Sequence, residues 1–137
     1  MDESLNLVLF SGTDDKLQAA AVLTAGAAAL GKPVNVFLQY WALDAFRANR
    51  IETDHGLAPE AGTEGRGHVD ALRIAGQASW AETLRQAKDL GGVDIQACSL
   101  SMDLLDINES ELDPLVDGVE GVTAFYLNAG EGQLVFI

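Results

Sequence analysis

The sequence predicts an α/β fold with a mostly parallel sheet of about five strands. Short apolar segments alternate with segments of helical pattern along most of the chain. The apolar segments are dense in Val, Leu and Phe, as strands buried on both faces of a parallel sheet require. The chain has 137 residues, of which 48% are hydrophobic. We therefore expect residues 1–137 to form one domain with a substantial core.

The first part of the chain predicts one β-α-β unit. Thr13 is expected to cap the helix of this unit, and Gly31 is expected to end it. The expected elements are a strand over residues 5–11, an Ala-rich helix over 14–30, a strand over 33–39 and a short amphipathic helix over 40–49.

The second part begins with an irregular segment over residues 50–78, with one helical turn over 69–74. Ser79 and Glu82 have the spacing of a capping box, which predicts a helix start. The further expected elements are a helix over residues 79–90, a strand over 93–97, a helix over 99–106, a brief helix over 108–118, a strand over 122–127 and a last strand over 133–137.

The composition bears on location and on partners. With 8 basic against 21 acidic residues, the net charge of −13 makes nucleic acid or an anionic membrane an unsuitable partner. The acidic start Met1-Asp-Glu-Ser is unlike a signal peptide, and no apolar run is long enough to insert into a membrane. A single cysteine cannot form an internal disulfide. We therefore expect a cytoplasmic protein.

Cys98 is the most informative residue. It is the only cysteine, and it lies where a buried strand meets the start of a helix. Ligands gather at the carboxyl ends of the strands in open α/β sheets, and the positive helix end favours a thiolate. These features predict a reactive thiol. The alternative is an inert, buried cysteine, because free cysteines are often buried.

Neighbouring residues are candidates for binding a substrate at Cys98. The hydroxyl groups of Ser99 and Ser101 can hold an anionic sulfur group at the helix start. Met102 falls four residues after Cys98, where it either forms a pocket wall or packs in the core. Gly12 and Thr13 follow the first strand at the same edge of the sheet and are included as further candidates.

The sequence does not predict a histidine that activates Cys98, and it predicts neither a metal site nor a cofactor. His55 and His68 lie in the irregular segment, and solvated loop positions explain both. One Cys and two distant His residues lack the dense spacing of a metal site. The glycines of residues 62–67 do not follow a strand, so they do not match a phosphate-binding loop, and we expect a flexible loop there.

Three segments resemble the DsrE/DsrF-like sulfur-transfer family in its small single-domain form. They are Gly12-Thr13-Asp14-Asp15-Lys16 with the Ala-rich helix after it, residues 33–38, and residues 97–105. The last of these is similar to a Cys-x-x-Ser-Met-Asp run in a branch whose members are often labelled peroxiredoxin-like. The resemblance covers nearly the whole chain and is weaker between residues 50 and 78.

The resemblance implies a Rossmann-like three-layer sandwich and assembly into trimers or hexamers. It also implies that Cys98 carries sulfur as a persulfide or thiosulfonate and passes it to a sulfur-relay partner. The chain departs from some members because it has no second cysteine. It also differs from the better-known relay members, which are basic soon after the cysteine, whereas this chain has acidic residues at Asp103, Asp106, Glu109 and Glu111.

Three functions remain open at this point. The first is a sulfur carrier or sulfurtransferase with Cys98 as its catalytic residue. The second is a non-catalytic, oligomeric module that binds a small ligand at the strand ends. The third is a redox sensor whose single cysteine is oxidised or capped. Thiol reactivity separates the second from the others, and transfer of sulfane sulfur separates the first from the third.

Overall fold

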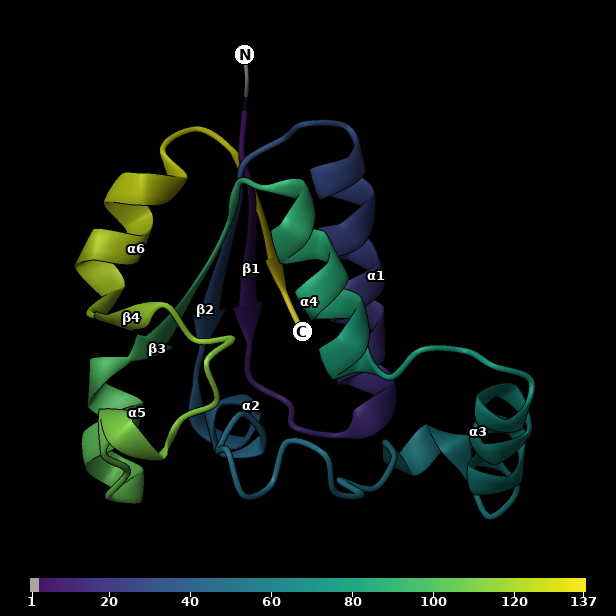
Figure 1. Cartoon of the computed structure of the whole chain (residues 1–137). Coiled ribbons are helices and arrows are strands. Elements are labelled where there is room, and N and C mark those ends of the chain that lie inside the picture. Colours follow the sequence, from purple (N-terminus) through teal and green to yellow (C-terminus); the bar gives the residue numbers. More distant parts are fainter. Residues whose placement is uncertain (1–2) are drawn as a thin grey trace.

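The computed structural model describes residues 3–137 and contains a five-stranded sheet in which all strands run parallel. The strand order is β4-β3-β2-β1-β5, and helices cover both faces (Figure 1). The predicted α/β class and the predicted number of strands are therefore confirmed. The arrangement is a Rossmann-like sandwich. No helix within residues 3–137 is both long and apolar enough to cross a bilayer.

The elements follow in chain order. The strands are β1 Leu5–Leu9, β2 Val34–Leu38, β3 Val93–Cys98, β4 Gly118–Glu120 and β5 Gln133–Phe136. The helices are α1 Asp14–Ala29, α2 Tyr40–Ala45, α3 Gly65–Ile74, α4 Trp80–Leu90, α5 Ser99–Leu105 and α6 Val122–Ala129, with 3₁₀ turns at Pro59–Ala61 and Glu109–Glu111.

One face of the sheet, here the α1 face, is apolar and covered by α1 and α4. Alternate residues of each strand point to this face, including Leu7, Val36 and Ile95, which are all buried. The alanines of α1 allow the helix to lie close to α4, and both belong to the main core. Thr24 is tolerated inside α1 because its hydroxyl donates to the carbonyl of Ala20 at 2.9 Å.

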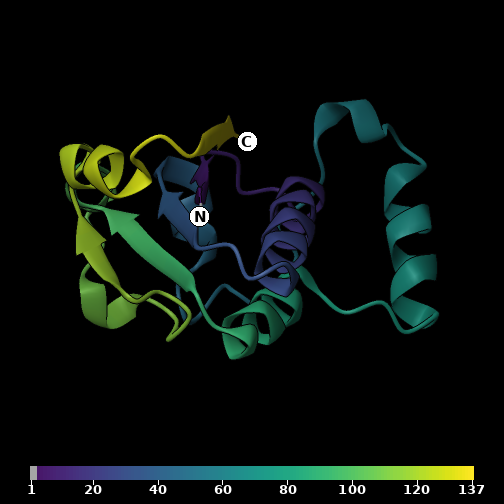
Figure 2. The ribbon, with the colours of Figure 1, turned by 90° about the horizontal axis from the view of Figure 1, so that it is seen from above.

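The opposite face, here the α6 face, is covered differently. Figure 2 shows α6 and α5 on this side, away from α1 and α4. Phe125 of α6 stacks on Phe37 of β2 with ring centroids 4.9 Å apart. Together with Val8 and Cys98 they form a second, smaller apolar cluster. The short helix α6 is thus anchored over the middle of the sheet.

Two expectations near the C-terminus were wrong. Residues 122–127 form most of helix α6 and not a strand, and residues 108–118 contain only a 3₁₀ turn followed by strand β4. Val122, Tyr126 and Leu127 are exposed apolar residues, which made a one-sided helix resemble a buried strand. The capping box at Asn108 is present, but Pro114 follows too closely for a longer helix.

The segment over residues 50–78 is more regular than expected. Helix α3 spans ten residues, so it includes Gly65 and Gly67, which we had expected in a flexible loop. Both ribbon views show α3 standing apart from the sheet and its covering helices. Arg66 ties its first turn to the body through ion pairs with Asp14 at 3.5 Å and Asp54 at 2.8 Å.

Candidate functional site

Cys98 lies at the predicted strand-to-helix junction. It is the last residue of β3 and the N-cap residue of α5. Its Sγ atom accepts a hydrogen bond from the backbone N–H of Ser101 at 3.4 Å. The thiol thus replaces the oxygen that usually caps a helix, and a backbone N–H that has no partner within the helix is directed at the sulfur.

The sulfur is shielded in this conformation. Cys98 is only 5% exposed and packs against Val8, Phe37 and Phe125. The ring of Phe125 was not among the expected site residues, because the sequence pattern placed residue 125 in a strand. A reagent larger than water therefore needs a local movement, most simply at the start of α6, to reach the sulfur.

A second helix begins beside the first. Cys98 and Glu120 are partners in the pairing of β3 with β4, and α6 starts two residues after Glu120. Ser99 lies next to this second junction, since its Oγ is 3.8 Å from the position that a Cβ on Gly121 would occupy. The positive ends of α5 and α6 therefore lie side by side, which favours negative charge at the Cys98 edge.

The three residues after Cys98 differ in their surroundings. Ser99 is exposed at the start of α5. Ser101 is 1% exposed, and its Oγ accepts from the backbone N–H of Tyr40 at 3.2 Å. Met102 belongs to the main core and not to the cluster around Cys98. Ser99 is thus the one of the three whose side chain is available to a ligand.

Gly12 and Thr13 lie at the end of β1, as expected, but not beside Cys98. Strand β2 separates β1 from β3, which corresponds to about 10 Å. Gly12 is pressed against α2, because a Cβ there would lie 2.3 Å from the carbonyl oxygen of Trp41. The glycine is therefore explained by close backbone packing.

Neither histidine is paired with the thiol. His68 is exposed on α3, which stands apart from the Cys98 edge (Figure 1). The ring of His55 lies 5.9 Å from that of Trp80, between centroids, close to the start of α1. Within residues 3–137, no group of three or more His, Cys, Asp or Glu side chains is arranged to hold a metal ion.

Comparison with known proteins gives consistent results. The model of the DsrE/DsrF/DrsH-like family matches residues 1–63, a range that ends before Cys98. The uncharacterized protein YrkE of Bacillus subtilis (strain 168) is 30% identical over 149 residues, covering 93% of this chain and 92% of that protein.

Two solved structures have the same fold. The ychN protein of E. coli has a TM-score of 0.59 at 13% identity, over 99% of this chain and 98% of that chain. A protein of unknown function, MTH1491 from Methanobacterium thermoautotrophicum, has a TM-score of 0.52 at 16% identity, over 99% of this chain and 100% of that chain. At these identities the similarity concerns the fold alone.

Proposed function

Because this chain belongs to the DsrE/DsrF/DrsH-like family, we propose that it is a sulfur carrier that holds sulfane sulfur on Cys98. The observation that carries the proposal is the hydrogen bond from the Ser101 N–H to Sγ. A backbone donor that faces the thiol also faces the negative charge of a thiolate or of a bound persulfide. The adjacent start of α6 adds a second positive helix end.

The proposed reaction needs only one cysteine. The Cys98 thiolate attacks the outer sulfur of a sulfane-sulfur donor such as thiosulfate, a new S–S bond forms, and sulfite leaves with the electron pair of the broken bond. The thiolate of an acceptor protein then attacks the outer sulfur, and the Cys98 thiolate leaves. Since the chain has no second cysteine, the persulfide persists until an external thiol removes it.

Intact mass spectrometry tests this proposal. The folded protein is incubated with thiosulfate, tetrathionate or polysulfide, beside Cys98→Ser and the matched variant Ser99→Ala. We expect an adduct of one or more sulfur atoms with polysulfide, removed by dithiothreitol, on the parent and on Ser99→Ala but not on Cys98→Ser. If the folded parent gains no adduct and its thiol resists alkylation until the protein is unfolded, the carrier function is excluded.

The burial of Cys98 favours one alternative, a non-catalytic module that binds a small ligand. A redox sensor with the same thiol differs from a carrier in the second step, the transfer of sulfur from Cys98 to an acceptor thiol. A carrier passes labelled sulfur from Cys98 to an acceptor thiol, whereas a sensor forms a sulfenic acid or mixed disulfide with no sulfur to pass on.

We also propose that the protein is a cytoplasmic homo-oligomer, a trimer or hexamer, with a relay protein as its acceptor. Exposed apolar side chains on the two helices that begin at the Cys98 edge support an interface there. These residues are Leu100 and Leu104 on α5, and Val122, Tyr126 and Leu127 on α6. Light scattering coupled to size-exclusion chromatography measures the assembly, and a monomer at micromolar concentration would contradict it.

A further inference from the structure

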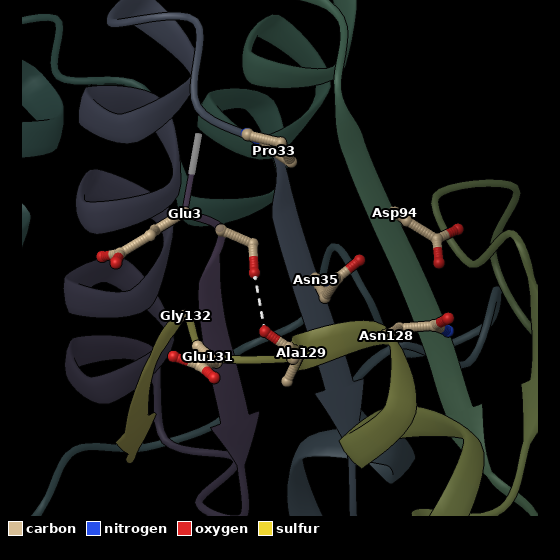
Figure 3. Close-up of a pocket in the computed structure, with 10 residues that line it drawn as sticks. Glu3, Pro33, Asn35, Asp94, Asn128, Ala129, Glu131 and Gly132 are labelled. Atoms are coloured by element: carbon tan, nitrogen blue, oxygen red, sulfur yellow. Dashed lines mark hydrogen bonds between the residues drawn. The ribbon is translucent and has the colours of Figure 1, made fainter. Parts of the chain in front are cut away.

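A cavity of about 910 Å³ lies at the opposite edge of the sheet, where the strands begin. Its floor is made by the α6 face of the sheet and its wall by the turn between α6 and β5 (Figure 3). Ser4 closes one side, because its hydroxyl donates to the carbonyl of Ala129 at 3.3 Å. Cys98 does not line this cavity, so its chemistry is separate from the proposed sulfur site.

A row of polar residues lies near the start of three neighbouring strands, and two of them, Asn35 and Asp94, line the cavity. Asn6 of β1 pairs in register with Asn35 of β2, and Asn35 pairs with Asp94 of β3. Each is the second residue of its strand, where a parallel sheet buried on both faces would carry an apolar side chain. All three point to the α6 face, because their neighbours in each strand point to the α1 face. The row therefore makes the start of the α6 face polar.

The hydrogen bonds fix which atoms of Asn35 face the cavity. Asn6 is fully buried, and its Nδ2 donates to the carbonyls of Ser4 and Gln133 and to the hydroxyl of Ser4. Its Oδ1 must therefore accept, and Asn35 Nδ2 donates to it at 2.8 Å. Asn35 Oδ1, an acceptor, is left without a hydrogen-bond donor among the described residues.

The same reasoning applies to the other two side chains. Asn128 Nδ2 donates to the carboxylate of Glu120 at 3.4 Å, which leaves Asn128 Oδ1 as a second acceptor. Asp94 Oδ1 accepts from Gln96 Nε2 at 3.0 Å, which leaves Oδ2 as a third. Asn35, Asp94 and Asn128 all line the cavity, from β2, β3 and α6 (Figure 3). Each of these three side chains thus contributes to the cavity lining one oxygen acceptor that has no hydrogen-bond donor among the described residues.

The electrostatic environment of this space is negative. Glu3, Asp94 and Glu131 line the cavity, and no Lys, Arg or His is among its lining residues. Asp94 forms no ion pair with a described basic residue. Burial, and then the charge of Asp94, raise the pKa of the neighbouring Glu120 above 4.5, as expected where negative charge lacks a counter-ion.

We propose that this cavity binds small molecules through a primary ammonium group. Such a group carries one positive charge and three N–H donors, which match Asn35 Oδ1, Asn128 Oδ1 and Asp94 Oδ2 in number and polarity. Ca²⁺ suits the site less well, because it takes six to eight oxygen ligands and usually several carboxylates, whereas only one carboxylate is in this group.

Two ligands of equal charge provide the test. Butylammonium has three N–H donors, and butyltrimethylammonium has none. Each is titrated into ¹⁵N-labelled protein at constant ionic strength, and backbone amide shifts are followed by NMR. We expect saturable shifts around residues 35, 94 and 128 with butylammonium. Binding of butyltrimethylammonium should be at least about tenfold weaker, since it has no N–H to donate to the three acceptors.

Variants locate the site. Asp94→Asn and Asn128→Ala should each weaken butylammonium binding by about tenfold. Asp103→Asn removes an equal charge from an exposed position of α5 and should not change the binding. Circular dichroism checks that each variant is folded. Equal affinity for the two ligands would refute the proposal, because it would show only a general attraction of cations to an acidic surface. Absence of saturable shifts, or tighter binding of Ca²⁺ or Mg²⁺ in a parallel titration, would also refute the proposal.

Discussion

Replacing Ser101 by alanine separates a structural role of this residue from a role in substrate binding. Its Oγ accepts from the N–H of Tyr40, which is the first residue of α2. Gln39, the N-cap of α2, makes no side-chain cap hydrogen bond, so α5 supplies the cap from outside the helix. Tyr40 also has a positive φ of 43°, an uncommon conformation that this contact helps to hold.

The expected cost follows from these contacts. Ser101→Ala removes the acceptor and leaves the Tyr40 N–H without its partner in a site where the serine is 1% exposed. Loss of a cap costs about 0.5–2 kcal/mol, and an unsatisfied buried donor costs about 1–3 kcal/mol. We therefore expect the free energy of unfolding to fall by about 1.5 kcal/mol. The exposed neighbour provides the control, since Ser99→Ala should change it by less than about 0.5 kcal/mol.

Urea denaturation followed by circular dichroism measures both variants. With a slope of about 1–3 kcal/mol per molar urea, the midpoint of Ser101→Ala should fall by about 0.5–1.5 M at unchanged slope. Sulfur loading of Cys98 should persist in Ser101→Ala, because the donor to Sγ is the backbone N–H of residue 101. A normal midpoint combined with lost loading would refute this reasoning and assign Ser101 to substrate binding.

Three further predictions concern packing and pH. Gly12→Ala should destabilise by about 3 kcal/mol, because its Cβ would meet the Trp41 carbonyl oxygen at 2.3 Å. Gly26→Ala, at an exposed position of α1 with nothing near its Cβ, should stabilise by about 0.5–1 kcal/mol, and urea midpoints measure both. Phe125→Leu should speed alkylation of Cys98 by iodoacetamide several-fold, since the ring covers the thiol, and unchanged rates would show another access route. Burial, and then the charge of Asp94, raise the pKa of Glu120, so its ionisation disfavours the folded state. The contribution of Glu120 to the free energy of unfolding therefore declines as pH rises from about 4.5 through the pKa of Glu120 in the folded state. Urea midpoints measured between about pH 4 and pH 7 should lose this decline in Glu120→Gln.

Local patterns were sufficient where one residue type dominates a segment. The dense apolar runs of β1, β2 and β3 predicted parallel strands because such strands are buried on both faces. The Ala-rich run predicted α1, and the Ser79 cap is formed by a hydrogen bond from the N–H of Glu82 at 3.2 Å. The junction at Cys98 was also predictable, because a strand pattern ends there and a helix pattern begins.

Patterns failed where burial depends on distant segments. The run Val122–Leu127 has the composition of a strand, but only Phe125 of its large side chains is buried, through its contact with Phe37. No local sequence pattern predicts this contact, since Phe37 lies more than eighty positions before Phe125 in the sequence. The same limit applied to the three residues that form β4, which is too short for a period of two to be visible.

The sequence by itself determined the α/β class, the apolar strands and the position of the single thiol, because these depend on residue type and spacing along the chain. Only the tertiary structure decided that α6 covers Cys98, that Ser101 caps α2, and that three polar side chains from separate segments line one cavity. Such contacts depend on strand order and register, and these are set by the packing of the whole chain.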